Sequence, residues 1–150
     1  MKRGIALKVI ESFSPEDTAA VGRALAEKAS PGDIITLTGD LGVGKTVFVK
    51  GFAEGLGIRE PVTSPTFTIM CVYTGGRIPL YHFDVYRIEE ADEMYAVGLD
   101  EYVNGDGVCL IEWAERIDDM LPKPLTRVTI EKNLSKDLDY RKITIEEVHD

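Results

Sequence analysis

Cysteine and histidine are scarce in this chain of 150 residues, which contains two of each. Cys71 and Cys109 lie far apart, each inside an apolar run, and the sequence has no Cys-x-x-Cys motif. We therefore expect two buried, reduced thiols and no disulfide. His82 and His149 add too few ligands for a structural zinc site. This scarcity argues against a disulfide- or zinc-stabilised fold and favours a cytoplasmic protein.

Long apolar runs and an excess of positive charge are also missing. No stretch approaches 18 uncharged apolar residues, so no membrane span is expected. Lys8 and Glu11 interrupt the N-terminal apolar run, which predicts a first strand, Ile5–Ile10, and no signal peptide. With 26 acidic and 17 basic residues, the net charge is −9. An acidic chain is poorly suited to hold nucleic acid alone, so we expect any contact with tRNA to be indirect.

Apolar periodicity predicts a single α/β domain over residues 1–150. Ser14-Pro15 with Asp17 marks the start of a helix that should run to about Ala29. Further strands are predicted at Ile34–Thr38, Phe67–Tyr73, Pro79–Tyr86, Val108–Glu112, Arg127–Glu131 and Arg141–Glu147, and further helices at Lys45–Leu56, Glu90–Val97 and Ala114–Leu121. Gly75-Gly76 indicates an antiparallel hairpin. The expected fold is a mainly parallel mixed sheet flanked by helices.

A phosphate-binding loop is the clearest motif. The residues Gly39, Asp40, Leu41, Gly42, Val43, Gly44, Lys45 and Thr46 match G-x-x-x-x-G-K-[ST] in full, between a predicted strand and a predicted helix. The glycines let backbone N–H groups turn toward phosphate oxygens, and the helix directs its N-terminal amides at the same anion. We expect Lys45 to neutralise the β- and γ-phosphates of a nucleotide and the Thr46 hydroxyl to bind Mg²⁺.

Two carboxylates compete for the role of acidic metal ligand, which in such proteins follows a neighbouring apolar strand. Glu112 ends the apolar run Val108–Glu112, whereas Asp84 ends Tyr81–Asp84. We favour Glu112, because its strand is apolar throughout. Asp84 would then reach the metal through water or orient the attacking water. The alternative for either residue is a strand-end acid that faces solvent.

Three further features have both a functional and a structural interpretation. His82, Asp84 and Tyr86 alternate onto one face of a predicted strand, where they either line the site or pack. The hydroxyl-rich segment Ser64-Pro65-Thr66-Phe67 is either a loop that senses the γ-phosphate or a turn before a strand. Trp113 either transmits changes at the metal site through packing or belongs to a core or an interface.

Together, four motifs resemble the TsaE family of bacterial tRNA threonylcarbamoyladenosine biosynthesis ATPases. They are Gly39–Thr46, Ser64–Phe67, His82-x-Asp84-x-Tyr86-Arg87 and Ile111-Glu112-Trp113, and their order and spacing agree with the family. The resemblance runs from Ser14 to about Ile130, and the tail after Asn133 matches nothing recognisable. It implies a P-loop NTPase fold, ATP and Mg²⁺ as cofactors, and hydrolysis that is weak or dependent on partners.

The resemblance also implies partners and residue roles. The partners would be the threonylcarbamoyl transferase subunit and its paralogue, of the TsaD and TsaB types, and the product N6-threonylcarbamoyladenosine at position 37 of ANN-decoding tRNAs. Hydrolysis would reset the complex, and this chain would transfer no group. By motif matching, the catalytic residues are Lys45, Asp84 and Glu112, the metal ligands Thr46 and Glu112, the nucleotide contacts Gly39–Thr46 and Thr18, and the switch residues Ser64, Pro65, Thr66, Phe67, His82, Tyr86, Arg87 and Trp113.

Two other functions stay open on the sequence alone. A small-molecule or nucleoside kinase uses the same loop, but it normally carries an arginine-rich lid, for which Arg87 and Arg116 are the nearby candidates. A non-catalytic docking module would use ATP only to hold a surface in one shape.

Overall fold

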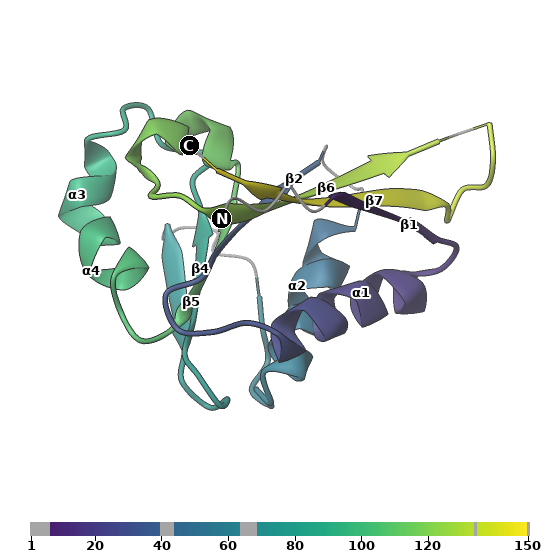
Figure 1. Ribbon diagram of the computed structural model, residues 1–150, viewed down its shortest axis with the longest axis horizontal. Helices are drawn as coiled ribbons and strands as arrows, with labels where there is room; N and C mark the ends of the chain where they lie inside the picture. The colour runs from purple at the N-terminus through teal and green to yellow at the C-terminus, as the bar shows by residue number, and fades with distance from the viewer. Residues whose placement is uncertain (1–6, 40–43, 64–68, 134, 150) are drawn as a thin grey trace, which may run out of the picture.

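The computed structural model describes residues 7–39, 44–63, 69–133 and 135–149, in which one sheet is flanked by helices on both faces (Figure 1). The strands are β1 (Leu7–Ser12), β2 (Ile34–Thr38), β3 (Met70–Tyr73), β4 (Leu80–Asp84), β5 (Val108–Glu112), β6 (Leu125–Lys132) and β7 (Arg141–Val148). The helices are α1 (Pro15–Glu27), α2 (Lys45–Gly55), α3 (Glu93–Val97) and α4 (Leu99–Val103), with 3₁₀ turns η1 (Ala114–Arg116) and η2 (Asp118–Met120). No helix in these ranges is long and apolar enough to cross a bilayer.

The sheet has the strand order β1-β7-β6-β2-β5-β4-β3. Its central strands β6, β2, β5 and β4 are mutually parallel, whereas β3 pairs antiparallel with β4, and β7 pairs antiparallel with β6 and β1. Because β1 opposes β7, it runs in the direction of the central strands, and five of the seven strands share that direction. This confirms the predicted mainly parallel mixed sheet with an antiparallel hairpin.

Burial on both faces explains why β2 and β5 are apolar without alternation. All five residues of β5 are buried, and so are the first four of β2. In register, Glu112 at the end of β5 lies between Leu37 of β2 and Asp84 of β4. The parallel centre therefore brings the carboxyl ends of three strands to one edge of the sheet, where Gly39 follows β2.

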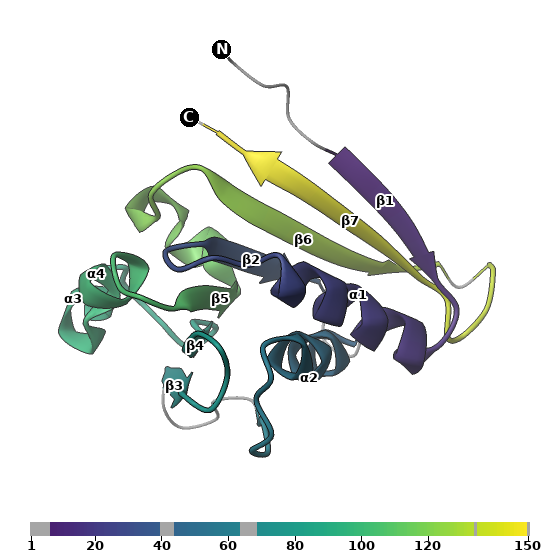
Figure 2. The same cartoon turned by 60° about the horizontal axis from the view of Figure 1, so that its bottom comes forward.

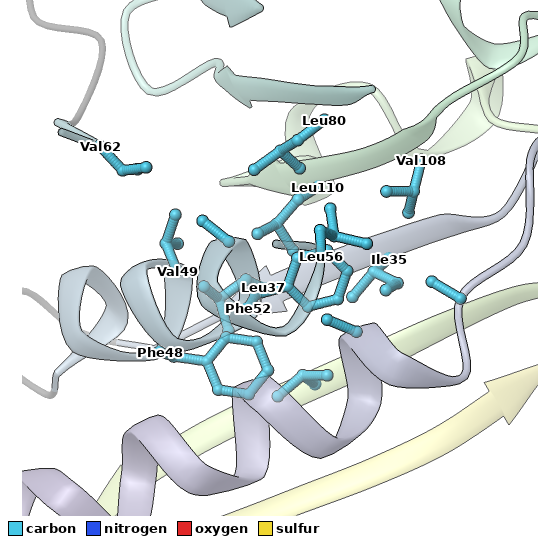
Figure 3. Close-up of a cluster of buried hydrophobic side chains, with 14 of the residues drawn as sticks. Ile35, Leu37, Phe48, Val49, Phe52, Leu56, Val62, Leu80, Val108 and Leu110 are labelled. Atoms are coloured by element: carbon cyan, nitrogen blue, oxygen red, sulfur yellow. The ribbon is translucent and has the colours of Figure 1, made fainter. Parts of the chain in front are cut away.

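Helices α1 and α2 cover one face of the sheet and cross in close contact (Figure 2). The helix α1 starts as predicted, since the Ser14 Oγ accepts the Asp17 N–H at 3.1 Å and the Asp17 carboxylate accepts the Phe13 N–H at 3.0 Å. Glycine makes the crossing possible, because a Cβ on Gly22 would lie 2.5 Å from the Phe48 carbonyl oxygen and one on Gly51 would overlap the Ala19 backbone. Apolar side chains of α2 then pack on those of β2, β4 and β5 (Figure 3).

A second core lies on the opposite face, under α3, α4 and the 3₁₀ turns. Here two predictions were wrong. The segment Ala114–Leu121 is not one helix but the turns η1 and η2, because the backbone of Ile117 between them leaves the helical region, at φ −130° and ψ 20°, and its side chain is buried. The helix α3 starts at Glu93, later than predicted, since the Glu93 carboxylate accepts the N–H groups of Glu89 and Glu90 and holds them in a turn. The helix α4 was not predicted.

Strand β4 ends at Asp84, so the prediction of a strand through Tyr86 was also wrong. The Asp84 carboxylate accepts the Tyr86 N–H at 3.0 Å, which turns the chain away from the sheet. Both cysteines are free thiols, as expected, but only Cys109 is buried, because Cys71 lies on the edge strand β3 and is half-buried.

Candidate nucleotide site at the ends of the central strands

The end of the phosphate loop is set by Gly44, which precedes the first residue of α2. Its φ of 102° lies in the left-handed region, which glycine adopts without strain. Its carbonyl oxygen accepts the Phe48 N–H at 3.0 Å and so opens the helix. Gly39 directly follows β2, as predicted. Asp40, Leu41, Gly42 and Val43 lie outside the described residues.

Lys45 is the first residue of α2 and is buried, with 7% of its surface exposed. Its ammonium nitrogen lies 4.2 Å from the centroid of the Trp113 ring. This distance is within the range of a cation–π interaction. Thr46, the next residue, is exposed to solvent at the first turn of the helix. A buried cation and an exposed hydroxyl thus stand side by side at a helix N-terminus, which is where an anion binds favourably.

Glu112 and His82 form a buried pair beside this cation. The His82 Nε2 lies 2.7 Å from a carboxylate oxygen of Glu112, and the two side chains are 1% and 6% exposed. Because β4 and β5 are parallel neighbours, their last residues Asp84 and Glu112 stand opposite each other in register. The other ring nitrogen of His82, Nδ1, has no hydrogen-bond partner among the described residues. His82 therefore holds the Glu112 carboxylate in one orientation.

Ionisable groups of both charge signs lie near Asp84 and shift its pKa. Burial and the neighbouring Glu112 carboxylate raise its pKa, while the Tyr86 N–H, His82 and Lys45 oppose the rise. The carboxyl group is half-buried, so it keeps access to solvent. An acid at this position, in the field of a lysine and next to a second carboxylate, fits the predicted role of orienting a water molecule.

The aromatic residues Trp113 and Tyr86 pack together next to Lys45. Trp113 directly follows β5 and has a φ of 63°, a left-handed conformation that a non-glycine residue rarely adopts. The Tyr86 ring packs on it at 4.8 Å between centroids, and the Arg116 guanidinium lies 5.7 Å from the Tyr86 ring. Tyr86 therefore contacts Trp113 instead of sharing a strand face with His82 and Asp84. Arg87, the last residue of its motif, is exposed.

A small pocket of about 230 Å³ lies beside Gly44. Thr18 contributes to it from α1 and is positioned by a 2.7 Å contact between its hydroxyl and that of Ser12. The pocket is lined by Ser14, Pro15, Thr18, Gly44, Val47, Asp139 and Arg141. The structure thus brings the predicted Thr18 next to the phosphate loop, where an adenine or ribose group has room.

Asp139 and Arg141 were missed by the sequence reasoning, which found no motif after Asn133. These residues reach the pocket because the turn between β6 and β7 is fastened to the β1–α1 junction. The Tyr140 hydroxyl donates to the Glu11 carboxylate at 2.8 Å, and the Tyr140 ring meets Phe13 at 5.6 Å. No local pattern signals a contact between residues so distant in sequence.

The donor set near Lys45 suits a hard cation. Carboxylate oxygens of Glu112 and Asp84 and the hydroxyl of Thr46 are oxygen ligands, which Mg²⁺ prefers, together with water and phosphate oxygens. Within the described ranges no three His, Cys, Asp or Glu side chains converge on a preformed metal site. The protein alone would thus supply only part of the shell, as is usual when the nucleotide completes it. Ser64, Pro65, Thr66 and Phe67, the predicted switch, lie outside the described residues.

Comparisons with known proteins agree with the motifs. A family model described as "Threonylcarbamoyl adenosine biosynthesis protein TsaE" matches residues 12–143. A Bacillus subtilis protein, tRNA threonylcarbamoyladenosine biosynthesis protein TsaE, is 54% identical over 121 residues, covering 81% of this chain and 75% of the relative. Its namesake in Treponema pallidum is 46% identical over 119 residues, covering 79% and 87%. The crystal structure of Bacillus subtilis YdiB matches with a TM-score of 0.80 at 43% identity, covering 98% of this chain and 89% of that one. This chain therefore belongs to the TsaE family.

Proposed function

We propose that this chain binds ATP with Mg²⁺ and hydrolyses it as the ATPase subunit of the assembly that forms N6-threonylcarbamoyladenosine at position 37 of ANN-decoding tRNAs. One observation carries the ATPase part of the proposal. Lys45 is buried at the start of α2, and the Asp84 and Glu112 carboxylates lie side by side at the ends of β4 and β5. The names of the Bacillus subtilis and Treponema pallidum TsaE relatives, which refer to threonylcarbamoyladenosine biosynthesis, support the pathway.

Each residue then has a defined task. Lys45 and the amides at the start of α2 neutralise the β- and γ-phosphates, and Thr46 and Glu112 hold the metal ion. The metal ion held by these residues would supply positive charge that offsets the negative charge developing on the phosphate oxygens. Asp84 orients the attacking water. The pocket beside Gly44, to which Thr18 contributes, would receive the adenosine moiety.

Partners follow from the pathway and from the charge of the chain. We propose that it works in the cytoplasm with subunits of the TsaD and TsaB types, and that hydrolysis resets the complex between turnovers without passing a group through this chain. A net charge of −9 disfavours direct binding of tRNA, which would then reach this subunit only through the complex. We expect hydrolysis by the isolated subunit to be weak, since the proposed activity depends on its partners.

Calorimetry with ATP and Mg²⁺ tests the binding step. Lys45→Ala should weaken ATP binding by about a hundredfold or more, because a buried cation that contacts phosphate is removed. Lys50→Ala is the matched control, since Lys50 is an exposed lysine on the same helix and should leave the affinity unchanged. Equal affinities for wild type and Lys45→Ala would contradict the proposal.

Phosphate release, measured with and without the two partner subunits, tests the reaction. We expect inorganic phosphate as the product and faster release with the partners present. Phosphate transfer to a nucleoside without added proteins would instead favour the kinase. Repeated rounds of tRNA modification by a variant that cannot hydrolyse ATP would favour the docking module.

A further inference from the structure

Among the residues that the structure describes, the close partner of the Lys45 ammonium is an aromatic ring and not a carboxylate. Its nitrogen lies 4.2 Å from the centroid of the Trp113 ring. The two nearby acids have other partners: Glu112 pairs with His82 at 2.7 Å, and Asp84 accepts the Tyr86 N–H at 3.0 Å. Within the described part of the chain, Lys45 forms no ion pair with either acid.

This arrangement matters because Asp84 and Glu112 could each compete with a phosphate for the Lys45 ammonium. Asp84 is close enough for Lys45 to lower its pKa, and Glu112 stands opposite Asp84 in register. An ion pair between buried or half-buried groups is strong and directional, and a phosphate would have to break it before it could use the ammonium. A ring face attracts the ammonium without neutralising its charge, so the cation stays available to an anion.

Trp113 is suited to this task by its ring and by its backbone. Among aromatic side chains, tryptophan attracts cations most strongly. Its φ of 63° is an unfavourable conformation that persists only because the surroundings fix it, and here the Tyr86 ring packs against the indole at 4.8 Å. Both features place the indole face under Lys45.

We propose that Trp113 is a positioning residue that reserves Lys45 for phosphate by holding its ammonium away from Asp84 and Glu112. The inference rests on the proposed function, because it concerns the same phosphate site. It assigns to Trp113 a contact with the lysine, in place of the metal-site or packing roles that the sequence suggested.

Four proteins test the inference by their ATP affinity: wild type, Trp113→Leu, Asp84→Asn and the double variant. Trp113→Leu should bind ATP about tenfold more weakly, since Lys45 then pairs with Asp84. In the Asp84→Asn background the same substitution should cost less than about threefold, because one competing acid is gone and the other, Glu112, is paired with His82. Trp113→Phe, which keeps a ring, should recover most of the loss. A merely structural role of the indole would give the same loss in both backgrounds.

Fluorescence tests the contact without nucleotide, because Trp113 is the single tryptophan of the chain. Lys45→Gln should shift the indole emission of the nucleotide-free protein, and Lys50→Gln, on the same helix, should not. Unchanged emission in Lys45→Gln would overturn the inference. If wild type binds ATP and Trp113→Leu binds it equally well, only this inference fails; if wild type binds no ATP, the proposed function fails first.

Discussion

Where α1 crosses α2, Gly22 and Gly51 bring two backbones into contact, and the side chains buried around them are apolar. Around the ends of β4 and β5 and the start of α2, in contrast, Lys45, His82 and Glu112 are buried although they are charged or polar. The crossing thus removes apolar surface from water, which stabilises the fold. The strand ends hold groups whose burial costs free energy unless a ligand or a partner compensates for it.

The comparison teaches that the two regions should fail in different ways. A substitution at the crossing should lower the free energy of unfolding and affect ATP only through folding. A substitution at the strand ends should reduce function and leave stability unchanged or higher. Three variants test this distinction, and the one with the greatest predicted change comes first.

Gly51→Ala should destabilise the protein by about 3 kcal/mol, because the new Cβ overlaps the Ala19 backbone. The gain in helix propensity from glycine to alanine, about 1 kcal/mol, is too small to offset this overlap. Thermal unfolding should show the Tm falling by about 6–12 °C. Gly75→Ala is the control, since its Cβ would meet only the end of the exposed Glu60 side chain, at 3.1 Å. Equal Tm values for the two variants would contradict the close crossing.

Glu112→Gln should slow ATP hydrolysis by about a hundredfold, which corresponds to roughly 2.7 kcal/mol of barrier, because the metal loses a charged ligand. ATP binding should lose its dependence on Mg²⁺, while the Tm should not fall. Steady-state phosphate release and calorimetry with and without Mg²⁺ measure these changes. Glu115→Gln provides the comparison, because Glu115 is an exposed glutamate in the turn just after β5. Wild-type rates in Glu112→Gln would remove this residue from the site.

Asp84→Asn should raise the Tm of the ligand-free protein at neutral pH by a few degrees. In a chain of this length, each kcal/mol of added stability raises the Tm by about 2–4 °C. Burial and the neighbouring Glu112 raise the pKa of Asp84 above its ordinary 3.8. Ionisation of Asp84 is therefore less favourable in the folded protein than in the unfolded chain, and it lowers the free energy of unfolding. The gain should therefore grow as the pH rises through this raised pKa and vanish below about pH 4. Thermal unfolding from pH 4 to pH 8 follows the trend.

Glu11→Gln is the matched control for that pH dependence, because its sign is opposite. Hydrogen bonds from Tyr140 and Lys136 lower the pKa of Glu11 below its ordinary 4.5. Ionised Glu11 thus stabilises the protein above pH 4.5, and this contribution is lost as the pH falls through the lowered pKa. The variant should be slightly less stable than wild type at pH 7 and equal to it in strong acid. The same sign for both variants would contradict the contrast between buried and surface acids.

The sequence predicted the parts of the fold that depend on local chemistry. The cap at Ser14, the apolar strands β2 and β5 and the helix after the phosphate loop all stand where their patterns placed them. It failed where a single side chain redirects the backbone. The Asp84 carboxylate ends β4 by binding the Tyr86 N–H, and Ile117 divides the predicted last helix. Such contacts depend on neighbours that periodicity does not describe.

For the candidate site, local motifs predicted which groups are available: the glycines and Lys45 of the loop, and an acid at the end of each of two strands. Tertiary structure alone decided how they meet, since parallel pairing of β4 and β5 sets Asp84 opposite Glu112, and the left-handed turn at Trp113 brings an indole to Lys45. The physical reason is the separation along the chain of the residues that each effect involves. Motif chemistry is local to a few residues, whereas the partner of a buried charge is chosen by the packing of segments far apart in the chain.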